Sequence, residues 1–244
     1  MRVRAAPRWL LSFCAAAGAF LVLSCSINQT LTVKADGSGT ANIHMELSKS
    51  LANYFLNLSE IAGKTELVES GQVFDLKEIR DSLESRPGLT VTRMATPTQT
   101  VLDMDVSYHS IKDVFDDDSL KSAGIATFTQ KDGVTTLSLH LDKQNYQRLG
   151  KLFPILDDPL FSGMGPQANQ SVTAAEYLKM IQFSLGSDGP AQLTKSNILL
   201  TIRPEGEIVS QSGGTVSGGA VIFKVPLLRV LVLDKALDYS VSFK

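Results

Sequence analysis

The sequence predicts an α+β domain, in which helices pack on one face of a curved antiparallel sheet. Two strand–turn–strand patterns, at residues 26–47 and 125–141, alternate apolar and polar side chains around glycine-containing turns and predict hairpins. Segments with helical spacing lie between the strands, and no internal repeat indicates a solenoid. We therefore expect a single domain over residues 25–244, with a helical insertion at about 142–189.

The first hairpin is the clearest local pattern. Its strands are expected at residues 26–35 and 41–47, joined by the turn Asp-Gly-Ser-Gly at residues 36–39. Ser48 then stands where an N-cap is expected, and apolar residues at helical spacing continue to about Ile61. This part of the chain therefore predicts strand, strand and amphipathic helix in immediate succession.

The next elements return to strands after a second helix. A helix is expected at 74–83, capped by Asp75 and stopped by Pro87-Gly88. Two strands follow, at 89–94 and 101–108, with a turn near Pro97 between them. An acidic helix at 110–120 then leads to a hairpin of strands 125–129 and 134–141, with its turn at Asp132-Gly133.

The middle of the chain differs from both ends. A helix reaches Phe153 and ends near Pro154, breaks follow, and Thr173 is expected to cap a second helix up to Phe183. After Gly189-Pro190 the chain is expected to return to strands, at 198–202, 207–210, 220–225, 227–233 and 237–243. The apolar run 220–233 is too short and too often interrupted by charge and proline to span a membrane.

The N-terminus has the layout of a secretory signal peptide. Basic residues precede an apolar stretch from Trp9 to Leu23, and small Ser24 stands directly before Cys25. The stretch is 15 residues long, shorter than the ~20 that a membrane-spanning helix needs. A plain signal peptide that is cut elsewhere, or an uncleaved anchor, is the alternative interpretation.

The end of this segment resembles the lipobox of bacterial lipoproteins. The resemblance implies cleavage after Ser24 and attachment of a diacylglycerol and a fatty acyl group, such as palmitate, to Cys25. The protein would then be lipid-anchored in the cell envelope, outside the cytoplasm. Ser26 follows the cysteine, and by the sorting rule of Gram-negative lipoproteins this favours the outer membrane where the cell has one.

Composition narrows the function of residues 25–244. Removal of three of the 23 basic residues leaves 20 against 25 acidic ones, a net charge of −5, which argues against nucleic acid as a partner. Cys14 lies in the removed segment, so Cys25 is the one remaining cysteine and neither a disulfide nor a thiolate metal site is expected.

No motif predicts catalysis, a metal ion or another cofactor. Residues 36–39 lack the ligand pattern of a calcium loop, and the acidic run Asp116-Asp117-Asp118 is typical of a solvated helix end. His44, His109 and His140 lie on separate predicted elements without the spacing of a helical metal site.

Apolar side chains on the predicted helices have two interpretations. The first is an ordinary core. The second is a cavity beneath the helices, of the kind that lipid-binding domains have, with residues 152–164 as a candidate lid or membrane-facing loop. The candidate cavity residues are Tyr54, Phe55, Leu58, Phe153, Phe161, Tyr177 and Ile181.

The lipobox cysteine, the adjoining strand, the turn at residues 36–39 and the following strand and helix resemble the LppM-like group of bacterial lipoproteins. The resemblance extends over residues 25–141 and includes Pro87-Gly88 and the strand pair after it. It implies a sheet-and-helix domain with a cavity and a link to lipid binding at the cell envelope. It carries no catalytic residues, and the insertion at 142–189 departs from the pattern.

Together these observations predict a non-enzymatic, membrane-tethered lipoprotein that binds a lipid or another apolar ligand. One alternative is a structural or assembly subunit that binds another envelope protein. A third hypothesis is an envelope hydrolase, which requires His109 or His140 to lie in a pocket beside a serine or a pair of carboxylates.

Overall fold

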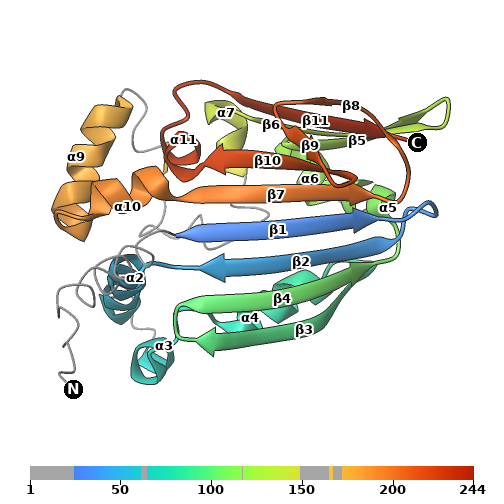
Figure 1. The fold of residues 1–244 in the computed structure, drawn as a ribbon. Helices are drawn as coiled ribbons and strands as arrows, with labels where there is room; N and C mark the ends of the chain where they lie inside the picture. Colours follow the sequence, from blue (N-terminus) through green and yellow to red (C-terminus); the bar gives the residue numbers. More distant parts are fainter. Residues whose placement is uncertain (1–24, 62–64, 117, 149–164, 167–171) are drawn as a thin grey trace, which may run out of the picture.

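The strands form two sheets in the computed structural model, which describes residues 25–61, 65–116, 118–148, 165–166 and 172–244 (Figure 1). The larger sheet has the order β3-β4-β2-β1-β7-β10-β9, and the smaller one has the order β5-β6-β11-β8. The strands of the larger sheet are β1 (Ser26–Val33), β2 (Gly39–Glu46), β3 (Leu89–Thr98), β4 (Val101–Tyr108), β7 (Asn197–Pro204), β9 (Thr215–Ser217) and β10 (Ala220–Pro226). Those of the smaller sheet are β5 (Ala126–Lys131), β6 (Val134–Leu141), β8 (Ile208–Ser212) and β11 (Leu237–Phe243).

The α+β class is confirmed, and both predicted hairpins are present. β1 pairs with β2 and β5 pairs with β6, each antiparallel. The division of the strands into two sheets was not predicted. Nor was the pairing of β1 with β7, which is parallel and joins strands from opposite ends of the chain.

The helices differ from the predictions at four places. Their bounds are α2 (Lys49–Ile61), α3 (Thr65–Ser70), α4 (Leu76–Glu84), α5 (Ile111–Asp116), α6 (Asp118–Ala123), α7 (Lys143–Tyr146), α9 (Ala174–Leu185), α10 (Gly189–Lys195) and α11 (Leu227–Val232). The single acidic helix is in fact α5 and α6, and the short helices α3 and α10 were missed; residues 63–73 were expected to be a polar connection. The strand predicted at 227–233 was wrong, because Leu227 to Val232 form α11 and Leu233 ends it in the left-handed conformation.

Two caps follow the sequence prediction closely. The Asp75 side chain accepts a hydrogen bond from the amide of Glu78 at the start of α4. Thr173 and Glu176 form a reciprocal capping box at the start of α9. Of the insertion at 142–189, the structure describes α7 and α9 but not residues 149–164 and 167–171, so the helix end near Pro154 lies outside the described residues.

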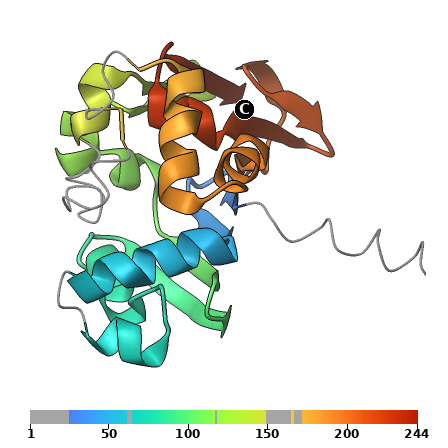
Figure 2. The ribbon, with the colours of Figure 1, turned by 90° about the vertical axis from the view of Figure 1, so that its left-hand side faces the viewer.

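The main core lies between the two sheets. Val221 and Phe223 of β10 are 0% and 1% exposed, and they pack in one cluster with Val241 and Phe243 of β11. The rest of the same face of the larger sheet is covered by α4, through a cluster that includes Val106. Figure 2 shows the half of the molecule that contains the smaller sheet above the half that contains α4. One face of the larger sheet is therefore shared between a helix and the smaller sheet.

A close approach fixes the register where β1, β2 and β4 meet. The Tyr108 hydroxyl donates a 2.5 Å hydrogen bond to the Thr32 carbonyl, passing over Gly39 of the strand between them. A Cβ at Gly39 would lie 1.9 Å from the Thr32 oxygen. Glycine is therefore required at the first residue of β2.

Four helices gather at one end of the larger sheet. α2, α9, α10 and α11 lie at the end where β1 begins, on the left in Figure 1 and facing the viewer in Figure 2. Within the described part of the chain, no helix is long and apolar enough to cross a membrane.

Candidate lipid-anchoring end of the molecule

Cys25, the residue expected to carry the lipid, lies at this helical end directly before β1. Its side chain is 6% exposed and belongs to an apolar cluster with Leu47 and Ala52. Phe55 of α2 and Leu227 of α11 pack against the same cluster. Burial, with a smaller contribution from the Glu46 carboxylate, raises the pKa of the Cys25 thiol to about 11. A thiol in this environment stays protonated and apolar near neutral pH.

A buried hydrogen bond fixes the backbone of Cys25. Its amide donates to the Ser196 hydroxyl oxygen at 3.0 Å, and that hydroxyl donates to the Gln192 carbonyl at 2.8 Å. The Ser196 carbonyl in turn accepts a hydrogen bond from the Leu227 amide at the start of α11. Ser196, which is 1% exposed, thus joins the start of β1 to α10 and α11. No sequence motif singled out this serine.

The predicted cavity residues of α2 and α9 are brought to the same end. Tyr177 and Ile181 are buried in a cluster of α9, α10 and α11, while Tyr54 and Phe55 are half-buried on α2. Burial raises the pKa of Tyr177, and the nearby phenols of Tyr146 and Tyr54 add to the effect. Leu58 is also half-buried on α2. Ser24, Phe153 and Phe161 lie outside the described residues.

These side chains pack as parts of helix–helix contacts. Neither of the two cavities described below is lined by Tyr54, Phe55, Leu58, Tyr177 or Ile181. Their role as ligand contacts therefore stays a prediction.

A cavity of about 290 Å³ lies beside α11, between it and the start of α9. Leu228 and Val232 supply apolar lining, with Ala174 from α9 opposite. Arg229 and Lys235 also line it, and neither side chain forms an ion pair with a described residue. The cavity thus combines apolar lining with two cations that form no ion pair within the described part of the chain, and Asp234 also lines it.

A second cavity, of about 320 Å³, lies between the start of β3 and the helices α5 and α6. Its lining includes Arg86, Asp113 and Asp116. The Asp116 carboxylate is 2.9 Å from the Lys121 ammonium group, and this hydrogen bond lowers the pKa of Asp116. The acidic run is thus partly neutralised by lysine. Among the residues that the structure describes, no three histidine, cysteine or acidic side chains converge as a metal site.

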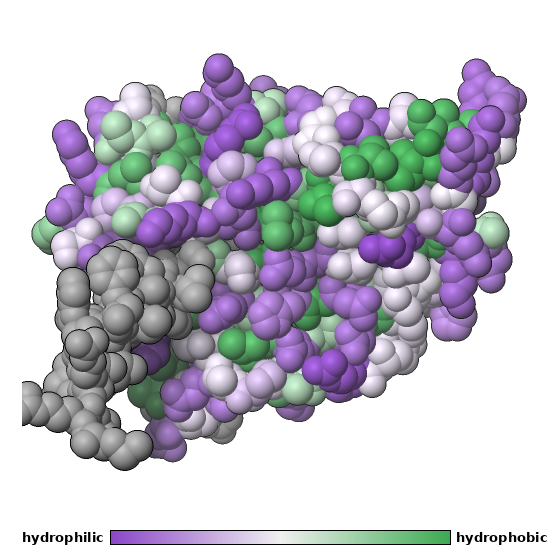
Figure 3. All heavy atoms as spheres, in the orientation of Figure 1, coloured by the Kyte–Doolittle hydropathy of each residue, from purple (hydrophilic) through white to green (hydrophobic). Residues whose placement is uncertain are grey.

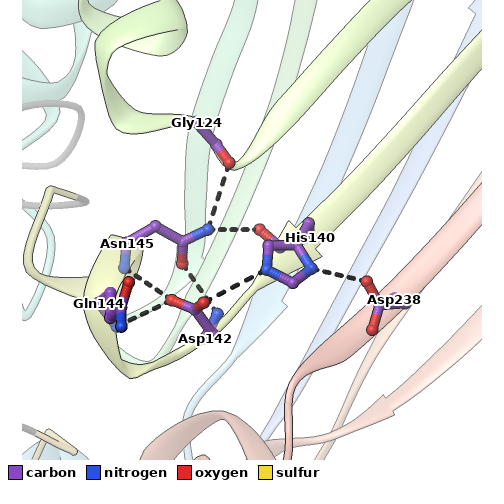
Figure 4. A network of polar contacts seen from close by, with 6 residues as sticks. All are labelled: Gly124, His140, Asp142, Gln144, Asn145 and Asp238. Carbon is purple, nitrogen blue, oxygen red and sulfur yellow. Dashed lines mark hydrogen bonds and ion pairs between the residues drawn. The ribbon is translucent and has the colours of Figure 1, made fainter.

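His140 forms the most extensive of the three histidine contacts (Figure 4). Its Nδ1 lies 2.6 Å from Asp238 on β11 and its Nε2 lies 3.3 Å from Asp142. These two hydrogen bonds, that to Asp238 first, raise the pKa of His140. Asp142 is also the N-cap of α7, where Asn145 completes a capping box and donates to the Gly124 and His140 carbonyls. The network joins α7 to the smaller sheet.

The hydrolase hypothesis requires a histidine that lies beside a serine or a pair of carboxylates and also lies in a pocket. His140 does lie beside two carboxylates, but it lines neither of the two cavities. His109 contacts the Gly88 carbonyl at 3.3 Å. His109 likewise lines neither of the two cavities.

His44 belongs to a polar row on the open face of the larger sheet. Its Nδ1 lies 2.7 Å from Asp103, and Arg93 lies within 3.6 Å of both Asp103 and Asp105. Asn42 donates to Asp105 at 2.8 Å. Figure 3 shows this side of the molecule, where hydrophilic and hydrophobic residues are mixed. The row pairs its charges internally and lines neither of the two cavities.

Comparisons with known proteins give little beyond this description. No protein-family model matches the chain, and no curated protein matches it. The chain is similar to the NMR structure of the folded domain of the LppM protein of Mycobacterium tuberculosis, with 10% sequence identity and a TM-score of 0.41 over 92% of each chain. Similarity at this level does not establish a common family.

Proposed function

We propose that this protein is a non-enzymatic lipoprotein of the cell envelope, anchored through Cys25, that binds a lipid or another amphiphile beside α11. The observation that carries the proposal is the position of the cavity. α11 contacts the Cys25 cluster through Leu227, and its next residue, Leu228, lines the cavity. The same short helix thus contacts the cluster around the anchor residue and lines the candidate binding site.

The geometry at Cys25 is compatible with acylation of its nitrogen. An N-acylated cysteine keeps one N–H, so the hydrogen bond to Ser196 survives the modification. The surrounding side chains, Leu47, Ala52 and Phe55 among them, are apolar, and because they bury Cys25 to 6% exposure they must move apart to admit a glyceryl thioether. No long linker separates the anchor from the domain, because β1 begins at Ser26.

The cavity lining favours an anionic amphiphile. Leu228 can contact an alkyl chain, and Arg229 and Lys235 can pair with a carboxylate or phosphate headgroup, with Asp234 as one opposing charge. A volume of about 290 Å³ is at the small end of ligand sites and suits a headgroup with part of a chain.

The test is lipid analysis of the protein extracted from membranes, by native mass spectrometry and by solvent extraction. We expect a non-covalent lipid in the wild-type protein and at least a roughly tenfold lower occupancy in an Arg229→Glu/Lys235→Glu variant, since each lost charge-assisted contact costs about 1.5–3 kcal/mol. Lys195→Glu is the matched control, because Lys195 is exposed at the same end and lines neither cavity.

Two results would contradict the proposal in different ways. Absence of bound lipid in every preparation removes ligand binding. A stoichiometric protein partner captured from detergent-solubilised envelopes, in the absence of lipid, favours the assembly-subunit alternative instead.

A further inference from the structure

Exposed apolar side chains concentrate on the helices at the Cys25 end. Five large apolar side chains of the described residues are strongly exposed, and three of them lie on α2 and α9: Ile61, Met180 and Phe183. Phe183 is 94% exposed and Met180 is 46% exposed. Single exposed apolar residues are ordinary, whereas neighbouring ones that form a patch indicate an interaction surface.

Met180 and Phe183 form one apolar stripe on the outer side of α9. They are three residues apart, so their side chains share a helix face. The adjoining face carries Tyr177 and Ile181, which are 1% and 4% exposed and pack toward α10 and α11. The outer stripe is therefore not part of the core. No described segment covers it.

The position of α9 indicates what covers the stripe. α9 contacts α2, and α2 packs against Cys25 through Phe55. Figures 1 and 2 show α9 at the outer limit of this end of the molecule. The 24 residues that precede Cys25 join the domain here, and the lipid proposed for Cys25 would hold this end at the bilayer.

We infer that α9 docks on the membrane surface, with Phe183 and Met180 inserted at the boundary between headgroups and acyl chains. The inference rests on the proposed anchor at Cys25. Lys179, which is exposed beside Met180, can keep its ammonium group at the headgroups while its methylenes lie along the apolar boundary. Because the domain carries a net negative charge once residues 1–24 are removed, the docking is apolar and needs no anionic lipid.

Tryptophan fluorescence tests this docking directly. The chain has one tryptophan, Trp9, which is lost with the signal peptide, so Phe183→Trp introduces a unique reporter at a fully exposed position. Val209→Trp on β8 is the matched control, because Val209 is 51% exposed and lies on the smaller sheet. Each membrane-extracted protein is reconstituted on phosphatidylcholine vesicles with and without lipids brominated in the acyl chains.

We expect a blue-shifted emission and about twofold or greater quenching by brominated lipid for Phe183→Trp, and neither effect for Val209→Trp. Equal emission of the two variants, whether both are quenched or neither is, overturns the docking of α9. Vesicle flotation of wild-type protein and Cys25→Ser separates the two failures. If the wild-type protein floats while Phe183→Trp stays unquenched, docking is wrong and the anchor stands. If the wild-type protein does not float, both are wrong.

Discussion

Replacement of Ser196 by alanine should destabilise the anchored end of the molecule. The change removes the acceptor of the Cys25 amide, at 3.0 Å, and the donor to the Gln192 carbonyl, at 2.8 Å. A buried amide left without a partner costs about 1–3 kcal/mol, so we expect the free energy of unfolding to fall by about 2 kcal/mol. With a urea dependence of about 2 kcal/mol per molar, the unfolding midpoint falls by about 1 M.

Pulse proteolysis in urea measures this midpoint on membrane-extracted protein, because it needs only the fraction that resists brief digestion. Thr194→Ala is the matched control. The Thr194 hydroxyl also donates to a carbonyl four residues earlier, that of Pro190, at 2.7 Å, but it is exposed. The control should change stability by less than about 0.5 kcal/mol. Equal midpoints for the two variants would refute a structural role of Ser196 at Cys25.

Two further outcomes are expected. Gly39→Ala should prevent the normal pairing of β1 with β2, because the new Cβ would lie 1.9 Å from the Thr32 oxygen. Circular dichroism and the yield of folded protein measure the loss of structure. A variant with the wild-type spectrum and yield would contradict the prediction. Asp238→Asn should lower the pKa of His140 toward its ordinary value of 6.5, because the hydrogen bond to the Asp238 carboxylate is the largest cause of the raised pKa. NMR titration of His140 measures the change. An unchanged pKa would contradict this cause. In the wild-type protein the contribution of His140 to stability is full below about pH 6.5 and is lost as the pH rises through its raised folded pKa.

Local patterns predicted local structure well. The turn at residues 36–39, the Asp75 cap and the Thr173 cap are all determined by residues within four positions of one another, and each is present. α10 was missed for a local reason too: Gly189-Pro190 was interpreted as a break, whereas proline is also favourable in the first turn of a helix.

Long-range structure was not predictable in the same way. β1 pairs with β7 across about 170 residues of chain, and nothing in either strand specifies the partner. The apolar run at 227–232 carries no period that separates strand from helix. It forms a helix where the Leu227 amide bonds to Ser196 and Val232 packs against α9, and both contacts come from tertiary structure.

The candidate site was predicted only in part. Cys25 follows from a contiguous motif, and the helices carrying Tyr54 and Tyr177 do meet at its end of the molecule. The cavity beside α11 was not predicted, because its lining comes from Ala174 and from residues 228–235, which are far apart in the sequence. Phe183, expected only as the last residue of this helix, lies exposed on the outer side of α9.

The central claim is that Cys25 joins this end of the domain to the membrane. The most direct test is the intact mass of the protein extracted from membranes, followed by its fragmentation. We expect a chain that begins at Cys25 and carries a diacylglyceryl and an acyl group on that residue, and we expect Cys25→Ser to abolish both the lipid and the membrane association. An unmodified Cys25, or a Cys25→Ser protein that stays on the membrane, would contradict the account.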